Sequence, residues 1–196
     1  MKVEAAIAAL DAGGIVAIPT DTVYGLAAEI SQPTAVATLF KLKERPTLVP
    51  LPVMVDSVEQ IAFLGVDWPD EAQMLAEAFW PGGLTIIVPV PHELAEMLGS
   101  TDDTAGFRIP DDDVLRRMMA VLGPFAVTSA NEHGQKPCYS AYEVLERFSS
   151  RDELVGVIDG GERSGEVSSV VDLTATPWRM LREGAVSMAE VVRVLN

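Results

Sequence analysis

Short apolar runs alternate with longer polar-faced segments along most of the chain, and this alternation limits the possible folds more than any other feature. The runs are rich in β-branched residues, which is typical of buried strands. The intervening segments carry helix start and stop signals such as capping boxes, proline and paired glycines. Alternating strands and helices predict an α/β domain. The predicted strands are 15–20, 51–55, 84–90, 106–110, 125–131, 153–160, 168–173 and 178–184, and the predicted helices are 3–12, 33–45, 70–80, 111–123, 140–148 and one that begins at Ser187.

The last three predicted strands follow one another without a helix between them. A purely parallel sheet needs a crossover connection between strands, so this cluster favours a mixed sheet. No linker, repeat or low-complexity tract interrupts the chain. One domain over residues 1–196 is the simplest expectation.

The composition is that of a globular protein. The 196 residues are 48% hydrophobic, which supports a folded core and argues against disorder. No uninterrupted apolar run reaches the roughly 18 residues that span a bilayer. The single cysteine, Cys138, cannot form an internal disulfide, and the sequence offers no metal-binding cluster. We therefore expect a cytoplasmic protein with no membrane partner and no metal-ligating residues.

Positive charge is concentrated at one place in an otherwise acidic chain. Lys and Arg number 14 against 29 Asp and Glu, a formal net charge of −15, yet KLKERP at 41–46 holds Lys41, Lys43 and Arg45. So acidic a chain is not attracted to nucleic acid at long range, and strong direct nucleic-acid binding is not expected. Two interpretations of 41–46 remain open. The cations could complement a helix C-terminus, or they could bind a phosphate or carboxylate.

Polar side chains stand where the predicted strands end. PTDTVYGL at 19–26 follows a buried strand, where a turn and a ligand site explain the residues about equally well. Ser129 and Asn131 share a parity, so in a strand they would point the same way. Standard phosphate-binding loops and the serine-nucleophile motif are missing. Both histidines, His92 and His133, are expected to be ordinary surface residues.

Several short motifs occur in one order, and together they resemble a known family. They are PTDTVYGL, K-x-R-P at 43–46, WPGGLT, FRIPD, S-x-N at 129–131, SSVVDL and LREG. This set resembles the YrdC/TsaC family, the threonylcarbamoyladenylate synthases, from about Val3 to Ser187. The resemblance implies a YrdC-like twisted, mixed parallel/antiparallel open sheet flanked by helices, with a concave electropositive site. The length is similar to that of the short, single-domain form.

The resemblance also implies a reaction. Family members condense L-threonine, bicarbonate and ATP into L-threonylcarbamoyladenylate and release pyrophosphate, with Mg²⁺ accompanying the ATP. A separate partner complex then transfers the threonylcarbamoyl group to tRNA. Negative charge gathers at each step, so fixed donors and cations matter more than a strong nucleophile. Holding three substrates together is itself a large part of such catalysis.

The matching motifs carry the family's roles to particular residues. Four residues are expected to act directly in the reaction: Lys43, Arg45, Ser129 and Asn131. L-Threonine is expected to contact Thr20, Arg108, Ser129 and Ser168. ATP and the bicarbonate-derived group are expected to contact Lys43, Arg45, Thr104, Asn131, Ser140 and Arg182. Ser140 also stands at a capping-box position, so a purely structural role is equally open.

Two places differ from the usual family pattern. Val49 stands where members commonly have lysine, and Glu132-His133 follows the S-x-N motif in place of Leu-Ser. These differences keep a second hypothesis open, a non-catalytic YrdC-like paralogue that binds nucleotide or RNA. A third, a carbamoyl-adenylate enzyme of the hydrogenase-maturation type, is opposed by the short length, because such enzymes carry this domain in a much longer chain.

Overall fold

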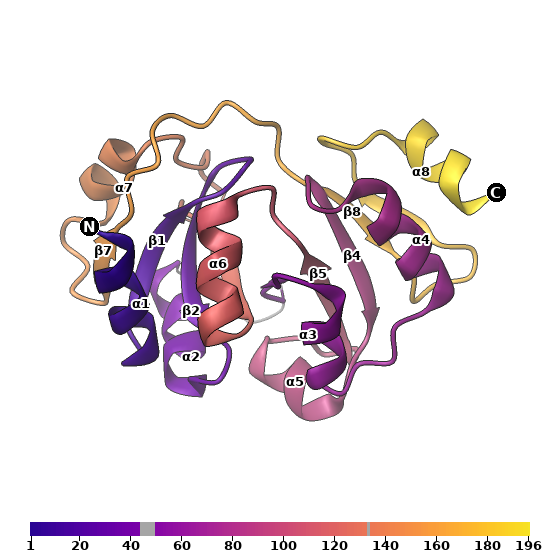
Figure 1. Ribbon diagram of the computed structural model, residues 1–196, viewed down its shortest axis with the longest axis horizontal. Coiled ribbons are helices and arrows are strands. Elements are labelled where there is room, and N and C mark those ends of the chain that lie inside the picture. The colour runs from indigo at the N-terminus through magenta and orange to yellow at the C-terminus, as the bar shows by residue number, and fades with distance from the viewer. Residues whose placement is uncertain (44–49, 133) are drawn as a thin grey trace.

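Nine strands in the described part of the chain form one mixed sheet (Figure 1). The computed structural model describes residues 1–43, 50–132 and 134–196. The strands are β1 (Ile15–Pro19), β2 (Tyr24–Glu29), β3 (Val53–Met54), β4 (Leu84–Pro89), β5 (Thr104–Arg108), β6 (Phe125–Ser129), β7 (Leu154–Val157), β8 (Ser169–Asp172) and β9 (Arg179–Arg182). Their order is β7-β1-β2-β6-β3-β5-β4-β8-β9. Three neighbouring pairs, β1–β7, β3–β5 and β4–β8, are parallel and the others antiparallel, so the predicted mixed sheet is confirmed.

Helices cover both faces of this sheet. They are α1 (Val3–Asp11), α2 (Pro33–Leu42), α3 (Val58–Phe63), α4 (Asp70–Phe79), α5 (His92–Met97), α6 (Asp113–Leu122), α7 (Ala141–Phe148) and α8 (Met188–Leu195). α1 and α6 pack together on one face, and α4 and α8 lie side by side near the C-terminus (Figure 1). None of the described helices is both long and apolar enough to cross a membrane.

The core lies in two layers because strand side chains alternate between the faces of the sheet. In β1, Val16 and Ile18 join a smaller cluster with residues of α1 and α6. Ile15 and Ala17 of the same strand point to the other face and join a larger cluster with residues of the remaining helices. All five residues of β1 are buried, as expected for a strand covered on both sides.

Side-chain caps fix the starts of three helices. Asp112 accepts hydrogen bonds from the backbone N–H groups of Val114 and Leu115 at the start of α6. Ser140 accepts from Glu143 N at the start of α7. Ser187 and Glu190 form a complete capping box at the start of α8. The predicted capping serines at 140 and 187 are thus confirmed as helix caps, which satisfy otherwise unpaired N–H groups.

Three elements were not predicted from the sequence, and a fourth differs in its bounds. PTDTVYGL is the connection of a β1–β2 hairpin followed by the start of β2, and this strand was not predicted. The short helices α3 and α5 were also not predicted. The helix expected over 33–45 has its last helical residue at Leu42, with Lys43 as its C-cap, and the rest of that prediction lies outside the described residues.

Candidate functional site

A cavity of about 300 Å³ lies along one edge of the sheet, the edge that is formed by the ends of the strands. β1, β5, β6 and β9 end at this edge, and β2, β4 and β8 begin there. Such an arrangement gathers residues from distant parts of the sequence, as is common for ligand sites in open α/β sheets. The lining residues are Thr20, Thr22, Val23, Gly25, Pro52, Met54, Thr85, Arg108, Val127, Thr128, Ser129, Asn131, Gln135, Pro137, Val167, Ser168 and Arg182.

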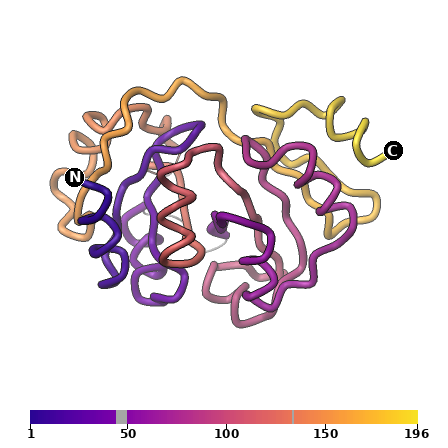
Figure 2. Tube along the Cα trace, viewed as in Figure 1, coloured from indigo at the N-terminus to yellow at the C-terminus, as the bar shows by residue number. Residues whose placement is uncertain are grey.

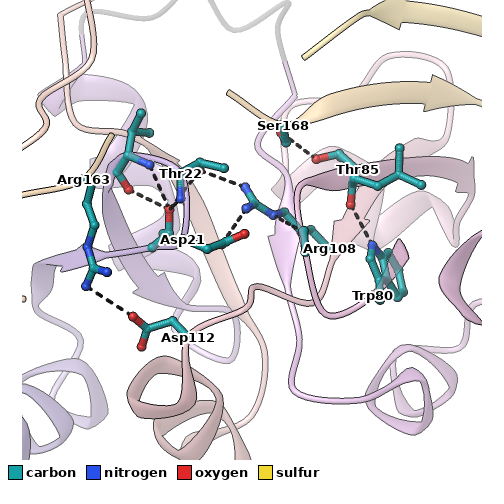
Figure 3. Close-up of polar contacts among 12 residues, drawn as sticks. Asp21, Thr22, Trp80, Thr85, Arg108, Asp112, Arg163 and Ser168 are labelled. Carbon is teal, nitrogen blue, oxygen red and sulfur yellow. Dashed lines mark hydrogen bonds and ion pairs between the residues drawn. The ribbon is translucent and has the colours of Figure 1, made fainter. Parts of the chain in front are cut away.

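Arg108 lies at the centre of the polar lining, at the C-terminal end of β5 (Figure 3). It is only 4% exposed. Its Nη2 donates to Asp21 Oδ1 at 2.6 Å, and its Nη1 donates to Thr22 Oγ1 at 3.2 Å. Its Nε donates to the carbonyl of Gly82 at 2.8 Å. These three bonds fix the guanidinium plane against the cavity, where a planar fork can bind a carboxylate.

The β1–β2 connection holds Arg108 in position through its side chains. Thr20 Oγ1 lies 3.0 Å from Thr22 Oγ1 and donates to the carbonyl of Val23 at 2.7 Å. It also accepts from the backbone N–H groups of Thr22 and Val23. Both threonines are buried and line the cavity. Thr20 therefore shapes the turn that places Thr22 and Asp21 against Arg108, besides presenting its side chain to a ligand.

Lys43 reaches the same region from the end of α2. It is 4% exposed, and its Nζ donates to Thr128 Oγ1 at 2.7 Å and to Ser129 Oγ at 2.9 Å. Ser129 Oγ in turn donates to Asn131 Oδ1 at 2.6 Å. The two side chains are thus in contact, as expected, although β6 ends at Ser129 and Asn131 lies beyond the strand. A buried ammonium next to two hydroxyls and an amide provides several donors for a developing negative charge.

Arg182 completes the opposite wall from the end of β9. Its Nε donates to the carbonyl of Ser168 at 2.8 Å and its Nη2 to Ser168 Oγ at 3.0 Å. Ser168 Oγ lies 3.1 Å from Thr85 Oγ1. Partial burial and the nearby charge of Arg108 lower the pKa of the Arg182 guanidinium. Two arginines on one cavity repel each other, and a bound anion would relieve that repulsion.

The cavity brings together six of the predicted site residues, which are Thr20, Arg108, Ser129, Asn131, Ser168 and Arg182. Lys43 joins them through Ser129. Thr104 does not line the cavity, because it lies at the opposite end of β5 from Arg108 and its backbone N–H bonds with Ser100. Ser140 does not line it either, and its hydroxyl caps α7. Arg45, Val49 and His133 lie outside the described residues.

Sequence reasoning did not select three residues that the site uses. Asp21 and Thr22 orient Arg108, and Thr85 bonds with Ser168. Their motifs, PTDTVYGL and WPGGLT, were noted, but nothing in the spacing said which side chains would face the cavity. The other predicted surface histidine, His92, is exposed and does not line the cavity. Its Nδ1 lies 2.7 Å from Asp103 Oδ1, and this pairing raises the pKa of His92.

Comparison with known proteins gives consistent results. The Sua5/YciO/YrdC family model, described as telomere recombination, matches residues 8–184. A protein of Pyrococcus abyssi (strain GE5 / Orsay) named threonylcarbamoyl-AMP synthase is 37% identical over 197 residues, which is 100% of this chain but only 57% of that protein. A protein of Mycobacterium leprae (strain TN) named putative threonylcarbamoyl-AMP synthase is 39% identical, covering 99% of this chain and 88% of its own length.

Solved structures agree with the fold. The crystal structure of P. abyssi Sua5 complexed with L-threonine superposes with a TM-score of 0.91 at 36% identity, covering 98% of this chain and 57% of that one. The E. coli YciO crystal structure has a TM-score of 0.86 at 22% identity and covers 96% and 92% of the two chains. This second likeness concerns the fold alone. The fold predicted from the motifs is thus shared with a solved chain of similar length and with part of a longer one.

Proposed function

Because the chain belongs to the Sua5/YciO/YrdC family, we propose that it is a threonylcarbamoyl-AMP synthase, a nucleotidyltransferase that condenses L-threonine, bicarbonate and ATP. The observation that carries the proposal is one cavity bordered by Arg108, Arg182 and the Lys43–Ser129 pair. All three substrates carry a negatively charged group, which in threonine is the carboxylate. An acidic protein can bind them where its few cations are collected in one place.

The threonine part of the cavity is assigned to Arg108. Its guanidinium is held from one side by Asp21 and Thr22, and a threonine carboxylate would approach the rest of its planar edge. Ser168 offers a hydroxyl to the substrate, and Thr20 lines the same part of the cavity while its own hydroxyl is engaged within the turn. The amine then attacks CO₂, a C–N bond forms, and the nitrogen gives up a proton to leave a carbamate. With bicarbonate as the carbon source, water is lost as well.

The nucleotide part is assigned to Lys43, Ser129, Asn131 and Arg182, together with Arg45 of the K-x-R motif. The carbamate oxygen attacks the α-phosphorus of ATP, a P–O bond forms, and the bond to the β-phosphate breaks to release pyrophosphate. Charge grows on the phosphoryl oxygens during this step, and the Lys43 ammonium, which lies 2.9 Å from Ser129 Oγ, would donate to them.

Mg²⁺ is proposed to arrive with ATP. The described residues contain no group of three or more His, Cys, Asp or Glu side chains placed to hold a metal. Phosphate oxygens and water commonly supply most ligands of Mg²⁺ at nucleotide sites, which fits a cavity lined by hydroxyls and cations. The ion would supply charge neutralisation on the phosphates.

The product is a reactive mixed anhydride, so a further step must use it. We assign that step to a separate threonylcarbamoyl-transfer complex acting on tRNA, in the cytoplasm. The formal charge of −15 opposes direct tRNA binding by this chain.

Pyrophosphate release is expected only when ATP, Mg²⁺, threonine and bicarbonate are all present. The carbamate is the attacking group, and it exists only after amine and CO₂ or bicarbonate have combined. A coupled pyrophosphate assay in degassed buffer, omitting one component at a time, measures this. Serine should replace threonine only in part, because one methyl group is worth about 1–3 kcal/mol.

Other outcomes of the same assay point elsewhere. Release with ATP alone, indifferent to threonine and bicarbonate, would overturn the proposal. ATP binding without any release would identify a non-catalytic paralogue. A response to carbamoyl phosphate but not to threonine would identify a carbamoyl-adenylate enzyme.

Ser140→Ala is expected to lower the free energy of unfolding by about 1 kcal/mol, because α7 loses its N-cap. Ser187→Ala is the matched control, since it removes the N-cap of α8 and Ser187 does not line the cavity. Urea unfolding of both variants measures the loss. If Ser140 also contacts ATP, Ser140→Ala alone will raise the KM for ATP, and equal KM values in both variants would remove Ser140 from the nucleotide site.

A further inference from the structure

A single extended segment crosses the edge of the sheet on which the cavity opens. This segment, residues 158–168, connects β7 with β8 and is called the strap below. Figures 1 and 2 show it as the orange chain that arches over the top of the molecule between the two sides of the sheet. At its start Ile158 N donates to Ala17 O, and at its end Val167 and Ser168 line the cavity.

The first half of the strap is fastened to β2 by a buried tyrosine. The Tyr24 side chain is fully buried, and its hydroxyl accepts from Gly160 N at 3.0 Å and donates to Gly161 O at 2.9 Å. Gly161 has a φ of +80°, which favours glycine, so the chain turns sharply here. The tyrosine thus fixes where the strap leaves β7.

The middle of the strap is fastened by Arg163. Its backbone N–H donates to Tyr139 O at 2.8 Å, and its Nη2 lies 3.4 Å from Asp112 Oδ2 (Figure 3). Both side chains are largely buried, at 23% and 12% exposure. The other oxygen of Asp112 caps α6, so the carboxylate is held rigidly in place for the arginine.

The strap rests on the loop that orients Arg108. A Cβ added to Gly165 would lie 2.5 Å from Asp21 O and 2.9 Å from Thr22 Cα, so the backbones of the strap and the loop are in direct contact. Asp21 and Thr22 are the two side chains that bond the Arg108 guanidinium. Movement of the strap away from this loop would therefore expose Asp21 and Thr22, which hold Arg108 in place.

We propose that Arg163 is a positioning residue for threonine, because its ion pair with Asp112 holds the strap down on the loop that orients Arg108. Arg163 touches no substrate and acts through the strap. The strap in this position keeps the threonine side of the cavity assembled. The inference rests on the proposed function only where it names threonine.

The test compares Arg163→Gln with Asp112→Asn. Asparagine caps a helix about as well as aspartate, so Asp112→Asn keeps the start of α6 and removes only the charge that faces Arg163. Each variant should raise the KM for threonine roughly 3- to 10-fold and change kcat less than twofold, as expected for a partly buried ion pair. The double variant should be no worse than either single variant, since both remove one interaction.

Arg179→Gln is the matched control. Arg179 also pairs with an aspartate, Asp172, at 2.7 Å, but at the opposite end of β8 and β9 from the cavity. It should leave the KM for threonine unchanged. Gly165→Ala provides a second route to the same state, because the added methyl group must lift the strap from the loop backbone. Its KM for threonine should rise at least as much as that of Arg163→Gln.

Hydrogen exchange of the strap amides separates this inference from the proposed function, because it needs no ligand. Exchange over 162–166 should be faster in Arg163→Gln and Asp112→Asn than in the parent protein and Arg179→Gln. Equal exchange in all four would overturn the inference, and so would additive effects of the two substitutions on KM. If the parent protein does not bind threonine in calorimetry, the proposed function fails while the exchange data still decide whether the ion pair holds the strap.

Discussion

Arg108→Lys is expected to reduce kcat/KM for threonine about 100-fold. Lysine keeps the positive charge beside Asp21, but it cannot donate in one plane to Asp21, Thr22 and Gly82 while binding a carboxylate. Loss of one or two charge-assisted hydrogen bonds, at about 1.5–3 kcal/mol each, accounts for that factor. Initial rates of pyrophosphate release at varied threonine concentration measure it.

The lysine substitution is preferred to alanine because of Asp21. Arg108→Ala would leave that carboxylate, only 17% exposed, without its partner, and breaking a buried pair commonly costs about 3–5 kcal/mol. Arg179→Lys is the control, since its ion pair is remote from the cavity. If Arg108→Lys keeps kcat/KM within threefold of the parent value, Arg108 holds the fold together and does not bind threonine.

Lys43→Met is expected to slow pyrophosphate release about 100- to 1,000-fold while the KM for threonine changes little. Methionine retains the unbranched stem and removes the ammonium that donates to Ser129, and the loss of one preorganised donor at a developing charge has effects of this size. Single-turnover measurements with all substrates saturating isolate the chemical step from binding.

Lys41→Met is the matched control for the end of α2. Lys41 is exposed in the last turn of that helix, two residues before Lys43. Any contribution of a cation to the helix C-terminus, up to about 1 kcal/mol, should be common to both variants. If Lys43→Met loses no more activity than Lys41→Met, Lys43 complements the helix C-terminus and does not act in the reaction.

The sequence predicts most strands because their apolar runs are buried on both faces. β2 escaped prediction because its sequence, YGLAAE, is rich in glycine and alanine, which have low strand propensity. Its place in the sheet comes from pairing with β1 and β6, which is a tertiary effect. α3 and α5 have six residues each, too short to show helical periodicity.

Motif order pointed to six residues that the cavity brings together, but it did not predict their geometry. Asp21 and Arg108 are 87 positions apart, and only the assembled sheet brings them to 2.6 Å. Thr104 is the opposite case, a residue close to Arg108 in the sequence but distant from it in the structure. It has the same parity as Arg108 in β5, yet four residues of extended chain place the two about 13 Å apart. Motif spacing alone cannot tell a residue that faces the cavity from one at the far end of the same strand.

The smallest strand has a mechanical consequence. β3 has two residues, Val53 and Met54, and among the described strands it is the one that lies between the β7-β1-β2-β6 half of the sheet and the β5-β4-β8-β9 half. The cavity straddles this joint, with Thr20 and Ser129 on one half and Arg108 and Ser168 on the other. A ligand that bonds to both halves acts across this joint, as the Arg108–Asp21 ion pair and the strap already do. Such a ligand therefore adds contacts between the two halves where the shortest strand of the described sheet supplies little backbone pairing.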